Sequence, residues 1–238
     1  RHVAGDAELW LVLIGHGTFD GREAKFNLRG PDVADAELAE WLRPVTRPLA
    51  VIATASASAP FIAKLSGRNR VIVTSTRSGS EQNYARFGRF LATAISDPAS
   101  DLDRDGQVSL LECYLAAAQR TAEFYAAAMR LATEHALIDD NGDGLGTPAD
   151  WFKGTRATRK AKEGAVADGP RAHQFHLVRS ADELGLDPQV RARRDALELE
   201  LARWRERKAK LPAADYQDGL RRLLRELASL YPEAIKRP

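Results

Sequence analysis

Residues 101–112 carry acidic side chains at the spacing that binds calcium in proteins. Oxygen-bearing side chains stand at loop positions 1, 3, 5, 9 and 12, with glycine at position 6 and an apolar residue at position 8. This is the full pattern of a twelve-residue EF-hand loop. The alternative is an acidic loop that caps the following helix, with Asp105 near its N-terminus. The predicted Ca²⁺ ligands are Asp101, Asp103, Asp105, the main-chain carbonyl of Gln107, and Glu112.

A second loop, residues 139–150, repeats the oxygen-bearing positions and the glycine at position 6. It departs from the pattern because Gly146 replaces the apolar residue, Asp150 reaches less far than a glutamate, and Pro148 opposes an ordinary exiting helix. An Asx-rich turn explains the same residues. The predicted ligands are Asp139, Asn141, Asp143, the main-chain carbonyl of Leu145, and Asp150.

A structural role for calcium is favoured over sensing. A sensor needs paired loops and a methionine-rich groove, but this chain has one methionine, Met129, and a long helix is predicted between the loops. Clustered carboxylates repel one another without the cation, so we expect calcium to raise the melting temperature. Calcium loops without sensor features are typical of an extracytoplasmic protein, and we expect that location.

A histidine and a serine follow two of the predicted strands. His16 stands between two glycines after the first strand, and Ser56 stands among small residues after the second. If the strands are neighbours, both side chains emerge at the same sheet edge, where a nucleophile and its base could meet. The alternative is structural: His16 in a turn, and a serine-rich turn that caps the helix starting at Pro60.

These strand ends resemble a known family. His16-Gly17 follows a hydrophobic strand, Ser56-Ala57-Ser58-Ala59 follows a second one, and Glu81-Gln82-Asn83-Tyr84 comes after a third, Val71–Thr76. Over about residues 8–96, this order resembles the legumain-like branch of the caspase/haemoglobinase clan of cysteine peptidases, more closely its bacterial homologues. The family fold has a further strand and helix before the histidine strand, for which this chain starts too late.

The resemblance implies catalytic roles and a peptide or protein substrate. The family's histidine at the position of His16 acts as acid–base, and its cysteine at the position of Ser56 attacks the peptide carbonyl. Amides near Gly17 and the nucleophile bind the oxyanion. The family's segment at Glu81 to Tyr84 lies beside the specificity pocket. The implied oxyanion- and substrate-binding residues are therefore Gly17, Glu81, Gln82 and Asn83.

The chain departs from the family at the nucleophile, because Ser56 replaces the cysteine. A serine hydroxyl needs a hydrogen-bonded base and usually an orienting carboxylate, for which Asp20 is the nearest candidate. Cys113 falls inside a predicted helix and is a poor substitute nucleophile. Three interpretations follow: a natural serine variant that still hydrolyses peptides, a non-catalytic peptide-binding or assembly module, or an engineered inactivation. A non-catalytic or only weakly active protein is slightly favoured.

Composition narrows the class of protein. The 238 residues carry a net charge of +2, and the single cysteine excludes an internal disulfide framework. No apolar run is long enough to span a bilayer. Residues 1–150 carry a charge of −5 and residues 151–238 a charge of +7, but the basic residues lack interleaved aromatic residues, so nucleic-acid binding is not expected. Because the chain starts at Arg1 without methionine, we expect a processed product or a piece of a longer protein.

The elements that must position these residues predict an α/β fold with a mostly parallel sheet and flanking helices, of the caspase/haemoglobinase type. Buried strands are predicted from three apolar runs, and helices lie between and after them. We expect this domain to cover residues 1–150. The predicted strands are Leu9–Ile14, Leu49–Thr54 and Arg70–Thr74; the predicted helices are Val33–Leu42, Pro60–Leu65, Asn83–Ile95 and Ser109–Thr133.

Two further segments complete the predicted organisation. Residues 151–185 are expected to form a basic linker, mobile over Lys153–Pro170, with an edge strand at His173–Val178. Residues 186–238 are expected to form an antiparallel helical hairpin that breaks at Pro212 and docks on the first domain or on a protein partner. Its seam is predicted from residues three and four apart: Leu197, Leu201, Trp204, Tyr216, Leu220, Leu223, Leu227 and Leu230.

Overall fold

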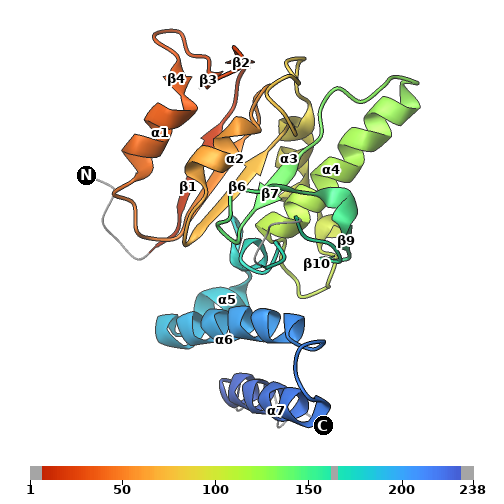
Figure 1. The fold of residues 1–238 in the computed structure, drawn as a ribbon. Helices are drawn as coiled ribbons and strands as arrows, with labels where there is room; N and C mark the ends of the chain where they lie inside the picture. The colour runs from red at the N-terminus through yellow and green to blue at the C-terminus, as the bar shows by residue number, and fades with distance from the viewer. Residues whose placement is uncertain (1–6, 162–165, 232–238) are drawn as a thin grey trace. The chain divides into compact units, whose positions relative to one another are not determined.

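The computed structural model describes residues 7–161 and 166–231 (Figure 1). The chain divides into two compact units, Arg1–Val178 and Arg179–Pro238. The segment after residue 150 therefore belongs with the first unit up to Val178, although the sequence analysis separated it as a linker. No helix in the described residues is long and apolar enough to cross a membrane.

The first unit is a mixed α/β fold built on a five-stranded sheet with the order β1-β5-β6-β7-β8 (Figure 1). The three predicted strands form its parallel part, β1, β5 and β6. The strands β7 and β8, which were not predicted, continue the sheet in antiparallel pairing. The strand bounds are β1 Leu9–Leu13, β5 Leu49–Ala53, β6 Arg70–Thr74, β7 Leu137–Asp139 and β8 Thr147–Pro148.

Helices cover both faces of this sheet. Side chains alternate between the faces of a strand, so in β5 Ile52 packs in one apolar cluster and Val51 in the other. The cluster around Val51 includes residues of α1 and α2, and the cluster around Ile52 includes residues of α3 and α4. Burial on both faces explains why these strands are apolar throughout. The helix bounds are α1 Asp35–Leu42, α2 Pro60–Leu65, α3 Phe87–Ala94 and α4 Leu110–Ala127.

Short elements line the edges of the first unit. A three-stranded antiparallel sheet follows His16, and a two-stranded one lies after the second acidic loop. The small strands are β2 Gly17–Phe19, β3 Ala24–Phe26, β4 Val33–Ala34, β9 Phe152–Lys153 and β10 Arg156–Ala157. Single 3₁₀ turns are formed by Pro98–Ser100, Ala149–Trp151 and Ala172–Gln174.

Three helices are shorter than predicted. The helix predicted from Val33 begins at Asp35, because Val33 and Ala34 form the strand β4, which pairs with β3. The helix predicted from Asn83 begins at Phe87, because the carboxylate of Glu134 accepts the amides of Arg86 and Phe87 and so caps its first turn. The helix predicted to reach Thr133 ends at Ala127, and Met129 after it adopts a left-handed φ of 51°. A residue in this conformation is a common helix terminator.

The predicted edge strand at His173–Val178 is wrong. Residues Ala172–Gln174 form a 3₁₀ turn, and Phe175 lies 3% exposed in the core with its ring edge-on to Trp10 at 5.6 Å between centroids. The mobile linker predicted over Lys153–Pro170 is also wrong in part, because β10 falls inside it and Asp168 is buried. Residues 162–165 of that prediction lie outside the described residues.

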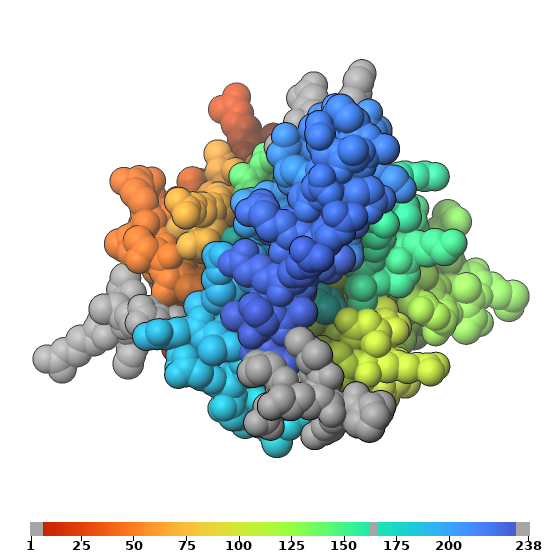
Figure 2. Space-filling model, turned by 90° about the horizontal axis from the view of Figure 1, so that it is seen from below, coloured from red at the N-terminus to blue at the C-terminus, as the bar shows by residue number. Residues whose placement is uncertain are grey.

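The second unit contains the predicted helical hairpin. Contacts between α6 and α7 join Trp204 to Tyr216, Glu200 to Arg222 and Arg193 to Glu226, so the two helices run antiparallel. The predicted seam is present: its leucines pack in one cluster with Trp204, and the two helices lie side by side (Figure 2). The helices of this unit are α5 Ala181–Gly185, α6 Pro188–Glu206 and α7 Ala213–Ser229.

Candidate active site and acidic loops

The ends of two parallel strands bring His16 and Ser56 together. Leu13 at the end of β1 pairs with Ala53 at the end of β5, and each chain continues for three residues to the side chain in question. The Oγ atom of Ser56 lies 2.8 Å from Nδ1 of His16. A hydroxyl and an imidazole at this distance can exchange a proton, which is the first requirement for a serine nucleophile.

The main chain of Gly17 occupies the remaining positions around Ser56 Oγ. The Gly17 amide donates to Oγ over 3.2 Å, and Oγ can donate to the Gly17 carbonyl over 2.9 Å. This approach requires glycine, because a Cβ on residue 17 would lie 2.3 Å from the Ser56 carbonyl oxygen. Ser56 has one hydroxyl proton, which it can donate either to His16 or to the Gly17 carbonyl. The residue Ser56 is 2% exposed. The amide implied for the oxyanion thus contacts the nucleophile itself.

Asp20 does not orient His16. Its Oδ1 accepts the amides of Arg22 and Glu23, each over 2.9 Å, and so holds the turn between β2 and β3. Both bonds lower the pKa of Asp20, and the bond from the Glu23 amide has the larger effect. Among the described residues, no carboxylate lies within hydrogen-bonding distance of the His16 ring, whose hydrogen bond goes to Ser56. Within the described part of the chain, the pair therefore lacks the third member of a serine triad.

A buried network of hydroxyl groups, which the sequence analysis did not identify, lies beside the Ser56 turn. The hydroxyl of Ser58 lies 3.2 Å from that of Ser75 and 3.3 Å from that of Thr76. Ser75 also donates to the Ala55 carbonyl over 2.5 Å. These bonds tie the end of β6 to the turn after β5. The sequence signal for this network is the group of serine and threonine residues that follows each of two adjacent strands.

The segment implied for the substrate pocket divides between the interior and the surface. The Glu81 carboxylate lies 2.5 Å from Nδ1 of His135. The Gln82 side-chain amide donates to the Phe19 carbonyl over 3.0 Å, and Asn83 is exposed. Of these residues, Glu81 also contacts the Ser56 turn, where its carbonyl accepts the Ala57 amide over 2.8 Å.

The first acidic loop gathers three predicted ligands. Carboxylate oxygens of Asp101, Asp103 and Asp105 all lie within 4.8 Å of one another. Main-chain amides inside the loop donate to each of them, for example Gly106 to Asp101 over 3.0 Å and Gln107 to Asp105 over 2.8 Å. Oxygen donors of this number and charge fit Ca²⁺, a hard cation.

Glu112 closes the first loop from the start of α4. It is 1% exposed, and its Oε1 accepts the amide of Leu102 over 2.8 Å, while Oε2 accepts the amide and hydroxyl of Ser109 in a capping box. A helix cap is therefore present together with the ligand cluster, but Ser109 and Glu112 form it and Asp105 accepts the Gln107 amide inside the loop. His173, not identified from the sequence, lies 2.8 Å from Asp103 Oδ2 through its Nε2 atom.

The second acidic loop repeats these turns in a buried setting. The carboxylate of Asp139 accepts the amides of Gly142 and Gly144 and the hydroxyl of Ser66, and Asp143 accepts the Leu145 amide over 2.9 Å. Asp139 is 1% exposed, and burial raises its pKa. The final predicted ligand, Asp150, is exposed at the surface.

Asp168, which lies 28 residues after Asp140, closes the second loop in place of Asp150. Its Oδ1 accepts the amides of Asp140 and Asn141 over 2.9 and 3.1 Å, and its Oδ2 accepts the Thr147 hydroxyl over 2.5 Å. The Asp140 carboxylate in turn accepts the Gly169 amide. Burial, and next the charge of Asp140, raise the pKa of Asp168 to about 8. Sequence spacing contained no signal for this pairing.

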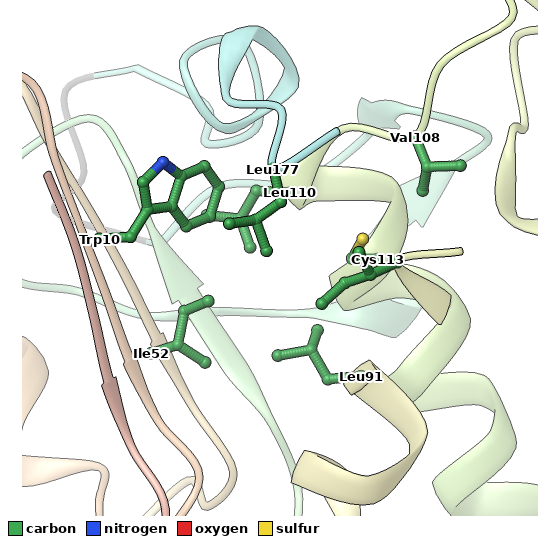
Figure 3. Close-up of a pocket in the computed structure, with 8 residues that line it drawn as sticks. Trp10, Ile52, Leu91, Val108, Leu110, Cys113 and Leu177 are labelled. Carbon is green, nitrogen blue, oxygen red and sulfur yellow. The ribbon is translucent and has the colours of Figure 1, made fainter. Parts of the chain in front are cut away.

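Cys113 lines a small apolar cavity of about 10 Å³ between the sheet and helices α3 and α4 (Figure 3). Trp10, Ile52 and Leu91 are among its other lining residues. Burial, and next the charge of Glu112, raise the pKa of the thiol to about 12, so thiolate does not form near neutral pH. Cys113 is therefore not a candidate nucleophile in place of Ser56.

Comparisons of the chain with protein-family models, with curated proteins and with solved structures find no match.

Proposed function

We propose that this chain is a peptidase homologue of the caspase/legumain type, with Ser56 as nucleophile and His16 as acid–base. The observation that carries the proposal is the 2.8 Å distance between Ser56 Oγ and His16 Nδ1 at adjacent ends of parallel strands. The substrate class is a peptide or protein segment. The order of the strand-end segments, which resembles that family, supports the choice of substrate.

In the proposed reaction, His16 Nδ1 accepts the Ser56 proton while Oγ bonds to the peptide carbonyl carbon. The C–N bond then breaks, the leaving nitrogen takes the proton from His16, and water hydrolyses the resulting ester by the same route. We expect slow turnover for two reasons. Among the described residues no carboxylate orients His16, and the Gly17 carbonyl competes for the hydroxyl proton.

A fluorophosphonate probe tests this proposal directly. We expect the folded chain to be labelled slowly at Ser56 and the Ser56→Ala variant to be unlabelled. Ser56→Cys supplies the thiol of the resembling family, and we expect it to cleave members of a peptide library. The matched control is Ser56→Cys with His16→Ala, in which cleavage should be lost. Absence of labelling together with absence of cleavage by folded Ser56→Cys would refute the proposal.

One observation favours a second candidate function, a non-catalytic peptide-binding module. Ser56 is 2% exposed and bonded to both polar groups of Gly17, as expected for a structural serine. On this alternative the unaltered chain is not labelled, yet it retains an immobilised peptide from the same library. Binding without labelling would favour the module, whereas labelling lost in Ser56→Ala would favour the peptidase.

We further propose that residues 101–112 bind Ca²⁺ in a structural role. The supporting observation is the grouping of the Asp101, Asp103 and Asp105 carboxylates on one side of a loop that Glu112 closes. Bound calcium would offset their mutual repulsion and fix the start of α4. The two acidic loops differ in the residue that closes them, Glu112 in the first and Asp168 in the second.

A further inference from the structure

Glu81 points into the protein, although the family resemblance assigns its segment to a substrate pocket. Its side chain is 12% exposed. The carboxylate accepts the amides of Arg77 and His135 over 2.9 and 3.1 Å, and the His135 ring lies 2.5 Å away through Nδ1. Because a carboxylate only accepts hydrogen bonds, the ring must donate from Nδ1. Glu81 therefore joins its own loop to the segment that precedes β7.

The main chain of the same residue holds the Ser56 turn. The Glu81 carbonyl accepts the Ala57 amide over 2.8 Å. Ala57 is 1% exposed and adopts a left-handed φ of 54°. For a residue with a Cβ this conformation is strained and persists only where the surroundings hold it. The bond to Glu81 is one such restraint, and it lies one residue from Ser56.

The loop that carries Glu81 also contacts the strand after His16. The Gln82 side chain donates to the Phe19 carbonyl over 3.0 Å. Gly79 packs against the Phe19 ring so closely that a Cβ would lie 2.4 Å from it. The loop of residues 77–83 therefore touches both chain segments that supply the candidate pair, and the Glu81–His135 contact anchors it from a third side.

We propose that Glu81 is a positioning residue for the His16–Ser56 pair and that His135 holds it in place. The inference rests on the proposed function for its purpose, but its geometry does not depend on peptide cleavage. The Arg77 guanidinium and the His135 ring both contact the Glu81 carboxylate, so its negative charge is offset inside the protein and is not free to bind a substrate side chain. Selectivity for a substrate side chain must then come from other residues, not from the charge of Glu81.

Nitrogen-15 NMR of the histidine rings in the full chain tests this proposal without requiring activity. Ser56→Ala supplies the reference spectrum of His16 without its hydroxyl partner. We expect His135→Leu to shift the His16 resonances most of the way towards that reference. His135→Asn should restore them, because the asparagine amide nitrogen stands where Nδ1 does and can donate to Glu81.

Tyr125→Phe is the matched control. Its hydroxyl donates to Glu134 over 3.0 Å, beside His135 in the same segment, but it does not touch Glu81. The His16 resonances should be unchanged in this variant. If the leucine variant does not fold, Glu81→Asp withdraws the carboxylate from the same ring and should give a smaller shift in the same direction. Unchanged His16 resonances in the folded variants, or equal shifts in Tyr125→Phe, would overturn the proposal, and peptide cleavage by Ser56→Cys would be judged separately.

Discussion

In residues 101–112 the carboxylates of Asp103 and Asp105 face solvent, whereas in residues 139–150 the carboxylate of Asp139 is buried. The turns themselves are alike. In each loop the first aspartate accepts the amide of the glycine at position 6, and the fifth residue accepts the amide two residues later. The difference lies in which group closes the loop.

Glu112 closes the first loop from within its own twelve residues, but Asp168 closes the second from outside. Asp150, the second loop's residue at position 12, stands exposed, and Asp168 bonds the amides of Asp140 and Asn141. The second loop starts in β7 and is therefore built into the sheet, while the first precedes α4 at the surface. The same sequence pattern thus gives a local, charged cradle in one place and a structural clamp in the other.

Calcium binding should separate the two loops. Ligand charge raises affinity, and the first loop has four carboxylates at the predicted positions against three in the second. At about 100-fold excess over Kd, one ion stabilises the fold by about 2.7 kcal/mol. Melting curves with calcium and with a chelator measure this. Asp105→Ala should remove most of the increase, and the matched change at the fifth position of the second loop, Asp143→Ala, the smaller part. No change with chelator would contradict a calcium site in either loop.

Neutralising the two closing residues should destabilise the fold by different amounts. Glu112→Gln replaces one of the two acceptor oxygens with an NH2 donor that faces buried donors, and should cost about 2 kcal/mol. Asp168→Asn should cost far less at neutral pH, because the raised pKa of about 8 already keeps Asp168 largely protonated and an amide has a similar shape. Urea unfolding in chelator measures both. Equal losses in the two variants would show that both closers act as ordinary carboxylates.

The sequence predicted the elements whose signals are local. Apolar runs gave β1, β5 and β6, and their parallel order placed His16 near Ser56. Helical spacing gave the hairpin seam. What it missed depends on partners far apart in the chain: the ring of His135 lies 54 residues from Glu81, and Asp168 lies 28 from Asp140. No periodicity marks such pairs.

The edge strand at His173–Val178 was predicted wrongly because alternation describes a strand only when a neighbour offers it hydrogen bonds. Here Phe175 fills the core beside Trp10, and its carbonyl accepts the amide of Leu110 at the start of α4. The strand β7 was missed because its sequence signal is short. It has only three residues, Leu137–Asp139, and the last of them begins an acidic loop whose sequence is typical of a turn.

Stability should depend on pH through the second loop. The pKa of Asp168 is raised to about 8 by burial and by Asp140, above its unfolded value near 4. The folded chain therefore binds more protons between these values, so this contribution is full below about pH 4 and is lost as pH rises through about 8. The slope of the unfolding free energy is up to about 1.4 kcal/mol per pH unit. Urea unfolding midpoints measured at several pH values should fall as pH rises in the parent chain and should change less in Asp168→Asn. Parallel pH dependence in the two proteins would contradict the raised pKa of Asp168.

The smallest predicted effect concerns His173 and the first loop. Its Nε2 atom lies 2.8 Å from Asp103 Oδ2, an oxygen that the calcium proposal assigns to the ion. A calcium ion bound to this carboxylate oxygen would compete with the His173 ring for it. Removing a hydrogen bond worth about 0.5–1 kcal/mol to the calcium-free loop should therefore raise calcium affinity two- to fivefold.

Isothermal titration of His173→Leu with calcium measures this change. His176→Leu, a nearby histidine in the same segment, is the control and should leave the affinity unchanged. A fall in affinity in His173→Leu would show that the histidine supports the bound state, and would place it with Glu112 among the groups that hold the loop in its binding conformation. A rise would instead show that the exposed loop is restrained by a contact that calcium displaces, for which the clamp at Asp168 has no counterpart.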